Sequence, residues 1–183
     1  SRRDSYMYGN LLPKSSEGQV GTGLGMTTST GTVSLILPTD IIKENDQKLQ
    51  LGGLEFIFHM APDSEAPAEM FFYIPKYKAL CTAENATHTL HNTYTLRGAK
   101  IRDPLDCSKY LNESIYLWGN DTEVLFAPHH WPVWNQKNIV KQLKLQRDMY
   151  RFINDQTLHY ANQGFTKEQI AQKVTLPKTQ NHY

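Results

Sequence analysis

The 183-residue sequence predicts a mixed α/β (α+β) fold. Alternating apolar residues in the first half are typical of β-strands, and a glycine pair divides two of these strands. Long amphipathic segments, typical of helices, fill the second half. The expected order is mostly strands, then a helix, a strand and further helices. This order supplies half of a layered architecture.

The expected strands lie mainly between residues 47 and 84. The run QKLQLGGLEFIFHM predicts a hairpin, with a strand up to Leu51, a turn at Gly52-Gly53 and a second strand over Leu54–Met60. The runs EMFFYIP and KYKALCTAE predict a second strand pair that ends at the acidic Glu84.

A helical pattern is expected from Thr87 onward, and DPLDCSKYLNESIYLWG is clearly amphipathic. EVLFAP predicts a short buried strand that runs directly into His129. A long helix is expected over NQKNIVKQLKLQRDMYRFINDQTLHYANQ, and Gly164 ends it. Thr166 and Gln169 have the spacing of a capping box for another helix.

Composition excludes several classes of protein. Nineteen Lys and Arg against eighteen Asp and Glu give a net charge of +1 with no basic stripe, so no nucleic-acid partner is expected. Cys81 and Cys107 form no disulfide framework and are expected to be buried thiols. The GTGLG run favours a glycine-rich loop near the mouth of a site over a dinucleotide site, because no strand precedes it and no helix follows.

Residues of metal-ligand type follow three of the expected strands. Glu65 lies in the turn after one strand, Glu84 ends a second and His129 ends a third. Such residues can converge in one cleft above a sheet, and carboxylates with an imidazole suit zinc or a similar divalent ion. Since no compact metal signature is present, Glu65 and Glu84 as ordinary solvated loop acids stay an open alternative.

His88 and His91 form an H-x-x-H pair at the expected start of a helix. They are interpreted as a capping or surface feature, or as side chains that orient the carboxylate of Glu84. Asn92 and Arg97 are candidates for binding an anion, since arginine offers a planar fork of donors. A salt bridge or a helix hydrogen bond is the alternative for both.

Several long motifs carry a resemblance to a known family. SEAPAEM, AENATHTLHNTYTLRGAKIRDPL and HHWP occur in that order, together with YMYGNLLP, GLGMTTSTGTVSLILPT and QRDMYRFINDQTL. Over nearly its whole length the sequence therefore resembles the dodecyl-sulfate-hydrolysing alkyl sulfatases of the metallo-β-lactamase superfamily.

The resemblance implies that residues 1–163 are the C-terminal half of a metallo-β-lactamase-like αββα sandwich, and that residues 164–183 begin a helical dimerisation domain. It implies hydrolysis of alkyl sulfate esters to an alcohol and inorganic sulfate. The implied cofactor is two Zn²⁺ per intact catalytic domain, sharing a bridging hydroxide. A homodimer in a periplasmic or secreted location is also expected from the family.

The resemblance also assigns residues. Glu65, of SEAPAE, matches a carboxylate that completes one zinc site, and Glu84, of AENATH, matches the carboxylate that bridges both metals. His129, of HHWP, matches a histidine of the second zinc site. Asn92 and Arg97 match residues that hold the sulfate group of the alkyl sulfate substrate.

Glu69 is expected to be structural. The H-x-H-x-D-H motif that supplies the family's other ligands does not occur in these residues. The chain is therefore expected to be the middle of a longer enzyme, inactive alone and dependent on a companion N-terminal segment. Two other interpretations stay open: another metallo-β-lactamase-like hydrolase, such as a phosphodiesterase or lactamase, and a non-catalytic fragment that acts as an interaction module.

Overall fold

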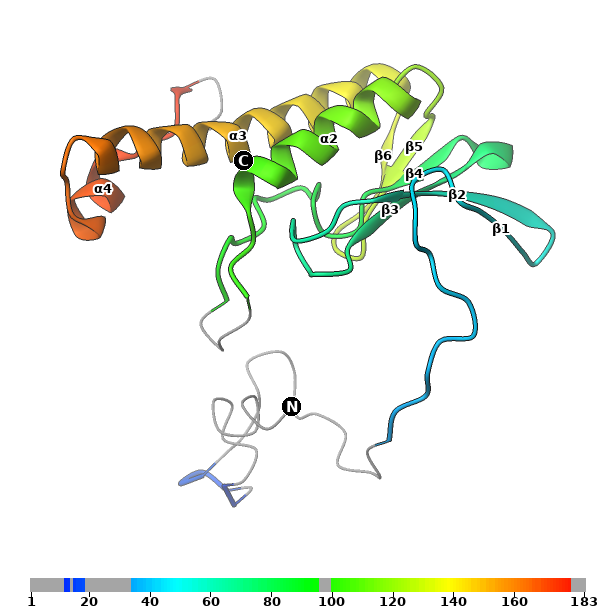
Figure 1. The fold of residues 1–183 in the computed structure, drawn as a ribbon, viewed down its shortest axis with the longest axis horizontal. Helices are drawn as coiled ribbons and strands as arrows, with labels where there is room; N and C mark the ends of the chain where they lie inside the picture. The colour runs from blue at the N-terminus through cyan, green and yellow to red at the C-terminus, as the bar shows by residue number, and fades with distance from the viewer. Residues whose placement is uncertain (1–11, 14, 19–33, 96–99, 179–183) are drawn as a thin grey trace. The chain divides into compact units, whose positions relative to one another are not determined.

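The structure is a computed structural model that describes residues 12–13, 15–18, 34–95 and 100–178. The chain divides into two compact units, one of residues 1–41 and 94–100 and the other of residues 42–93 and 101–183. Every described helix and strand belongs to the second unit, as do all described residues of the candidate site (Figure 1).

The second unit is built on one six-stranded sheet in which the strands follow chain order. All neighbouring strands are antiparallel except β4 and β5, which are parallel. The strands are β1 (Lys48–Leu51), β2 (Leu54–Met60), β3 (Met70–Ile74), β4 (Ala79–Cys81), β5 (Val124–Phe126) and β6 (Val133–Trp134), with a 3₁₀ turn η1 (Pro75–Tyr77) after β3.

The predicted hairpin is confirmed. Leu51 pairs with Leu54 across a two-residue turn at Gly52 and Gly53, whose φ angles are 58° and 78°. Both lie in the left-handed region that a two-residue hairpin turn requires and that glycine adopts without steric cost. The second predicted strand pair is also confirmed, since β3 and β4 pair antiparallel.

The first helix, α2 (Pro104–Trp118), connects the parallel strands β4 and β5. Its start is encoded locally: the carboxylate of Asp103 accepts hydrogen bonds from the backbone N–H groups of Leu105 and Asp106, and a proline occupies the first turn. Two parallel neighbouring strands need such a crossover connection. The segment that carries Glu84 lies in this connection, between β4 and α2.

The long helix α3 (Gln136–Asn162) and the short helix α4 (Lys167–Lys173) complete the fold. Both were expected from the sequence, and the capping box of Thr166 with Gln169 is present. Helices α2 and α3 lie side by side over the sheet (Figure 1). No helix in the described part of the chain is both long and apolar enough to cross a membrane.

The helix expected from Thr87 is wrong: residues 87–95 are not helical, and the helix begins at Pro104. The carbonyl of Thr87, which would accept the i+4 bond in a helix, instead accepts hydrogen bonds from the amides of Gln142 and Gln146 on α3, at 2.7 and 3.0 Å. Tertiary partners thus replace the local hydrogen bonds of a helix, and His88 and His91 lie in a loop.

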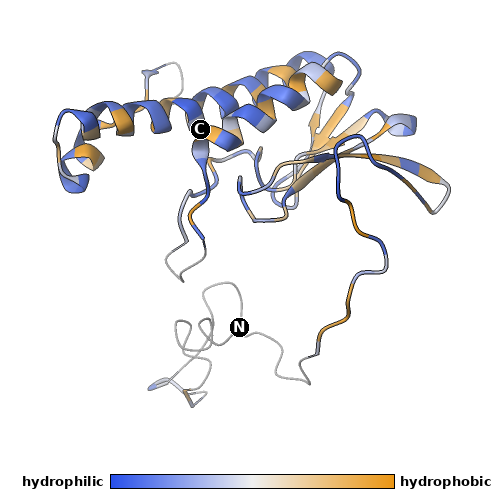
Figure 2. Ribbon diagram, viewed as in Figure 1, coloured by the Kyte–Doolittle hydropathy of each residue, from blue (hydrophilic) through white to orange (hydrophobic). Residues whose placement is uncertain are grey.

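The hydrophobic core lies between one face of the sheet and the two helices, where the apolar positions of both layers meet (Figure 2). Its largest members are Phe71, Tyr73, Leu80, Leu111, Trp118, Leu125, Ile139, Leu143 and Tyr150. The two cysteines are free and buried, as predicted. On alternating sheet positions, the rings of Phe56, Phe58, Phe72 and Phe126 contact one another with centroids 5.6 to 6.4 Å apart.

Candidate metal centre

Three loops that follow strands carry the predicted metal ligands. Glu65 lies between β2 and β3, Glu84 follows β4, and His129 follows β5. Each loop also contains a non-glycine residue with positive φ within two positions of the ligand candidate, which is unusual because left-handed backbone costs about 1–2 kcal/mol per residue. These residues are Asp63 (φ 61°), Ala83 (φ 46°) and His130 (φ 66°).

Glu65 and Glu84 come together with a third residue, His91. One ligand atom from each of the three lies within 4.8 Å of the others. Two carboxylates and an imidazole are ordinary zinc ligands. His129 approaches the same group, with its Nε2 atom 3.1 Å from Glu84 Oε1. Glu84 is therefore the central residue, since His91 Nε2 lies 2.9 Å from its other oxygen.

The ring of His91 is oriented as a metal ligand would be. Its Nδ1 atom lies 3.1 Å from the carbonyl oxygen of Asn92, and a nitrogen beside a carbonyl carries the proton. A neutral ring then presents a lone pair at Nε2, toward the carboxylate of Glu84. Two acceptors at this distance require either a second ring proton or a shared cation between them. The sequence predicted a capping, surface or orienting role for His91, and its proximity to Glu65 was missed.

Arg102, which the sequence did not single out, contacts Glu65 directly. Its guanidinium donates to Glu65 Oε1, and the arginine side chain is only 8% exposed. Burial raises the pKa of Glu65, but the hydrogen bond and positive charge of Arg102 outweigh it, so the pKa lies below the usual range. Glu65 is therefore held as a carboxylate, the form that a metal requires.

Glu69 has the opposite environment. Burial first, and then its hydrogen bond with the carboxylate of Glu65, raise the pKa of Glu69 to about 7. Of these two carboxyl groups, Glu69 therefore binds a proton more readily than Glu65. Its backbone carbonyl also accepts from Ala61 at 2.9 Å.

The floor of the site is a narrow crevice lined by Glu65, Glu84 and His91 and closed by buried polar residues. Asn85 is 1% exposed and donates to the hydroxyl of Ser64 at 2.8 Å. Its Oδ1 atom is buried and has no hydrogen-bond partner within the described part of the chain. The crevice thus combines two carboxylates, an imidazole and a buried amide oxygen, which are oxygen and nitrogen groups able to bind a cation. The residues present therefore fit a divalent metal.

Of the two residues predicted to bind sulfate, Asn92 and Arg97, the structure describes Asn92. Asn92 is exposed and directly follows His91, and its Oδ1 accepts from Arg102 at 2.5 Å. Its amide thus lies beside the guanidinium that also contacts Glu65. Arg97 lies outside the described residues.

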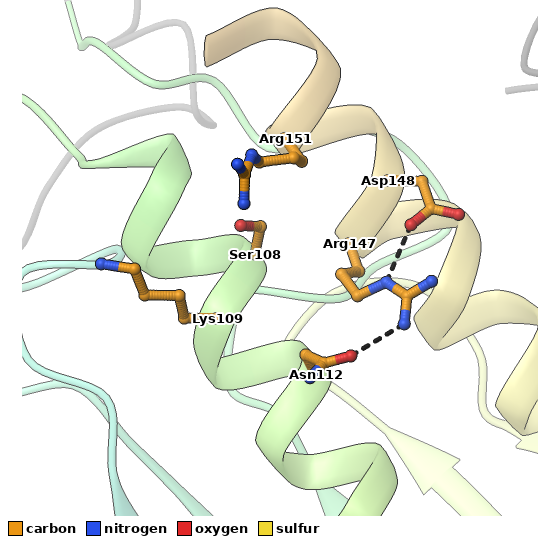
Figure 3. A pocket seen from close by; sticks show the side chains of 6 residues that line it. All are labelled: Ser108, Lys109, Asn112, Arg147, Asp148 and Arg151. Atoms are coloured by element: carbon orange, nitrogen blue, oxygen red, sulfur yellow. Dashed lines mark hydrogen bonds and ion pairs between the residues drawn. The ribbon is translucent and has the colours of Figure 1, made fainter. Parts of the chain in front are cut away.

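A second, cationic groove lies between α2 and α3 (Figure 3). Arg147 crosses it and donates to Asn112 and to Asp148, both at 2.8 Å. Arg151 pairs with Asp155 at 2.7 Å. Both arginines are thus paired with side chains of α2 or α3. Among the described residues that line this groove, no group resembles the cluster of Glu65, Glu84 and His91.

Comparison with known proteins shows which proteins this chain resembles. No family model matches the chain. A linear primary-alkylsulfatase of Pseudomonas sp. is 64% identical over 178 residues, which cover 97% of this chain and 26% of that protein. This chain is similar in sequence to the alkylsulfatases over nearly its whole length. An alkyl/aryl-sulfatase of Saccharomyces cerevisiae is 46% identical over 178 residues, covering 97% of the chain and 28% of that protein.

The same relationship holds for the fold. The stereoselective inverting sec-alkylsulfatase Pisa1 from Pseudomonas sp. superposes with a TM-score of 0.81 at 38% identity, over 96% of this chain and 28% of that one. The resemblance to alkylsulfatases and the α/β class predicted from sequence are therefore confirmed. The chain spans about a quarter of the length of these relatives. The predicted domain boundary at residues 163 and 164 stays a prediction.

Proposed function

We propose that the whole protein hydrolyses alkyl sulfate esters, such as dodecyl sulfate, to an alcohol and inorganic sulfate. The observation that carries this proposal is the 64% identity to a linear primary-alkylsulfatase across 97% of the chain. The acidic cluster supports it, because ester hydrolysis at neutral pH needs an activated water and a means of stabilising negative charge.

We propose zinc as the metal, in a binuclear site. Glu65 would hold one ion, His129 the other, and Glu84 both. Support comes from Glu84, whose two oxygens face two different histidines at 2.9 and 3.1 Å. His91 is an additional candidate for the Glu65 side of the site. When bound, zinc would supply a Lewis acid and a water of lowered pKa.

The remaining chemistry belongs to the chain itself. Arg102 lowers the pKa of Glu65 and so favours the carboxylate form that binds a metal. Asn92 and Arg97 would hold the sulfate group and stabilise the charge that develops on its oxygens. An arginine fork matches two sulfate oxygens at once, which a lysine ammonium does not. In the whole protein, Arg97→Lys should therefore weaken use of dodecyl sulfate while zinc content is unchanged.

Release of inorganic sulfate from dodecyl sulfate by the whole protein tests the function. Glu84→Gln should lose more activity than the ~10–100-fold expected of a residue that only supports a metal ligand. Glu123→Gln is the matched control, because Glu123 is an exposed glutamate paired with Lys78. Turnover of a phosphate diester or a β-lactam, with none of dodecyl sulfate, would refute the proposal in favour of another hydrolase.

Two further expectations concern assembly. The 183 residues alone should be inactive on dodecyl sulfate, because the second of the two proposed zinc sites would have only Glu84 and His129, fewer than the three protein ligands usual for a catalytic zinc. Absence of turnover by these residues, with turnover by the whole protein, is the expected result. A homodimer is a prediction from the family resemblance, and light scattering of the whole protein tests it.

A further inference from the structure

The two residues before α2, Arg102 and Asp103, form backbone hydrogen bonds with two loops of the site. The N–H group of Arg102 donates to the carbonyl of Thr93 at 2.9 Å, and the N–H group of Asp103 donates to the carbonyl of Asp63 at 3.1 Å. One contact fixes the loop that carries Glu84 and His91, and the other fixes the loop that carries Glu65. The start of α2 therefore sets the separation between the two loops.

The side chain of Arg102 repeats this connection at the site itself. Its Nε donates to the backbone carbonyl of Glu65 at 3.2 Å, and its Nη2 donates to the Glu65 carboxylate. Its Nη1 donates to Asn92 twice, to the backbone carbonyl at 2.9 Å and to Oδ1 at 2.5 Å. One guanidinium thus holds two residues that have different proposed roles.

The planar shape of the guanidinium matters for this arrangement. Its donors point in fixed directions, so the groups that accept from it are fixed relative to each other. With Oε1 of Glu65 bound to Arg102, the carboxylate that lies beside Glu84 and His91 is held in one orientation. With Oδ1 of Asn92 accepting from Arg102, the orientation of that amide is fixed relative to Glu65. An amide NH₂ donates hydrogen bonds, which suits the oxygens of a sulfate group.

Burial makes the arrangement rigid. Arg102 has a side-chain exposure of 8% and Glu65 of 15%, so water competes little for their hydrogen bonds. Losing one partner of such a buried pair leaves an uncompensated charge, which is costly. The pair therefore persists in one geometry.

We propose that Arg102 is the positioning residue of this site, which holds the ligand Glu65 and the sulfate-binding Asn92 in one fixed arrangement and so couples metal binding to substrate binding. This inference rests on the proposed function. In this role Arg102 acts on the reaction through the two residues that it orients.

The test uses the whole protein loaded with zinc and the variants Arg102→Lys and Arg102→Met. Arg147→Lys is the control, because the Arg147 guanidinium likewise donates hydrogen bonds to neighbouring side chains but lies in the groove between α2 and α3. Zinc retention is measured as the rate of transfer to a chromophoric chelator, and substrate binding as KM for dodecyl sulfate and inhibition by inorganic sulfate. Far-UV circular dichroism establishes that each variant is folded.

Both Arg102 variants should release zinc ~10–100-fold faster than the control, as expected for loss of a group that orients a ligand. KM should rise as well, and Arg102→Lys should lie between the unmodified protein and Arg102→Met. If Arg102 and Asn92 act together, their effects on KM are not additive. Asn92→Ala should therefore raise KM when introduced alone but raise it little further in the Arg102→Lys variant.

A folded Arg102→Lys variant with the zinc retention and KM of the control would overturn the proposal. So would additive effects of Arg102→Lys and Asn92→Ala on KM, because additivity means that the guanidinium does not position the amide. If Arg102→Met fails to fold, Arg102→Lys decides the outcome. An unmodified protein that releases no sulfate refutes the proposed function, whereas an active protein with unaffected Arg102 variants refutes this inference alone.

Discussion

Replacement of Leu143 by alanine should strongly destabilise the fold. Leu143 lies on α3 with no exposed surface and belongs to the core between the helices and the sheet. Leu→Ala removes three carbon groups, and about 0.8 kcal/mol for each gives a transfer loss of about 2.4 kcal/mol. The cavity left behind raises the expected loss to about 2–5 kcal/mol. Leu158→Ala is the matched control, since Leu158 is on the same helix but 54% exposed.

Urea unfolding, followed by the fluorescence of tryptophan, measures both variants. Trp118 is 7% exposed and stacks on Tyr73, with ring centroids 5.6 Å apart, so its emission reports loss of the core. Leu158→Ala should change the free energy of unfolding by no more than about 0.5–1 kcal/mol. Equal losses for the two variants, or a loss below about 1 kcal/mol for Leu143→Ala, would contradict the packing described above.

Three further predictions concern the site and its surroundings. Glu84→Ala should lose more zinc than Glu69→Ala, because two histidines converge on Glu84 alone; equal zinc content by elemental analysis would refute the assignment. Ala83→Gly should stabilise the protein by up to about 1 kcal/mol, because glycine relieves its left-handed backbone, while Ala79→Gly within β4 should destabilise it; thermal unfolding compares the two, and a loss of stability in Ala83→Gly would contradict the expectation. Burial raises the pKa of the Cys107 thiol to about 12, so this thiol stays protonated at neutral and mildly alkaline pH and its reactivity should rise only as the pH approaches that value; rapid labelling of Cys107 in the folded protein by a thiol reagent at mildly alkaline pH would show the burial to be wrong.

The local elements of the fold could be predicted because their signals are local. The turn at Gly52-Gly53 needs two left-handed residues, and glycine supplies both. The capping box of Thr166 and Gln169 closes within four residues. The amphipathic pattern of α3 repeats over many turns, so a few residues that depart from the pattern do not obscure the helix.

The loop from Thr87 to Thr93 could not be predicted in this way. Its histidines and threonines fit a helical pattern, but the carbonyl of Thr87 is satisfied by two glutamines more than fifty positions away in the sequence. Hydrogen bonds from a distant helix leave no trace in local periodicity. Tertiary contacts therefore decided the conformation of the segment that carries His91.

The candidate site likewise contains residues that the sequence indicated and residues that only the structure revealed. The sequence by itself determined which residue types follow the strands, and so indicated Glu65, Glu84 and His129, because strand ends at one edge of a sheet place their loops near each other. Only the tertiary structure decided that His91 joins the two glutamates and that Arg102 holds Glu65 and Asn92 together. The physical reason is that a hydrogen-bond network depends on distances of a few ångströms between loops, and those distances are set by how α2 and α3 pack on the sheet.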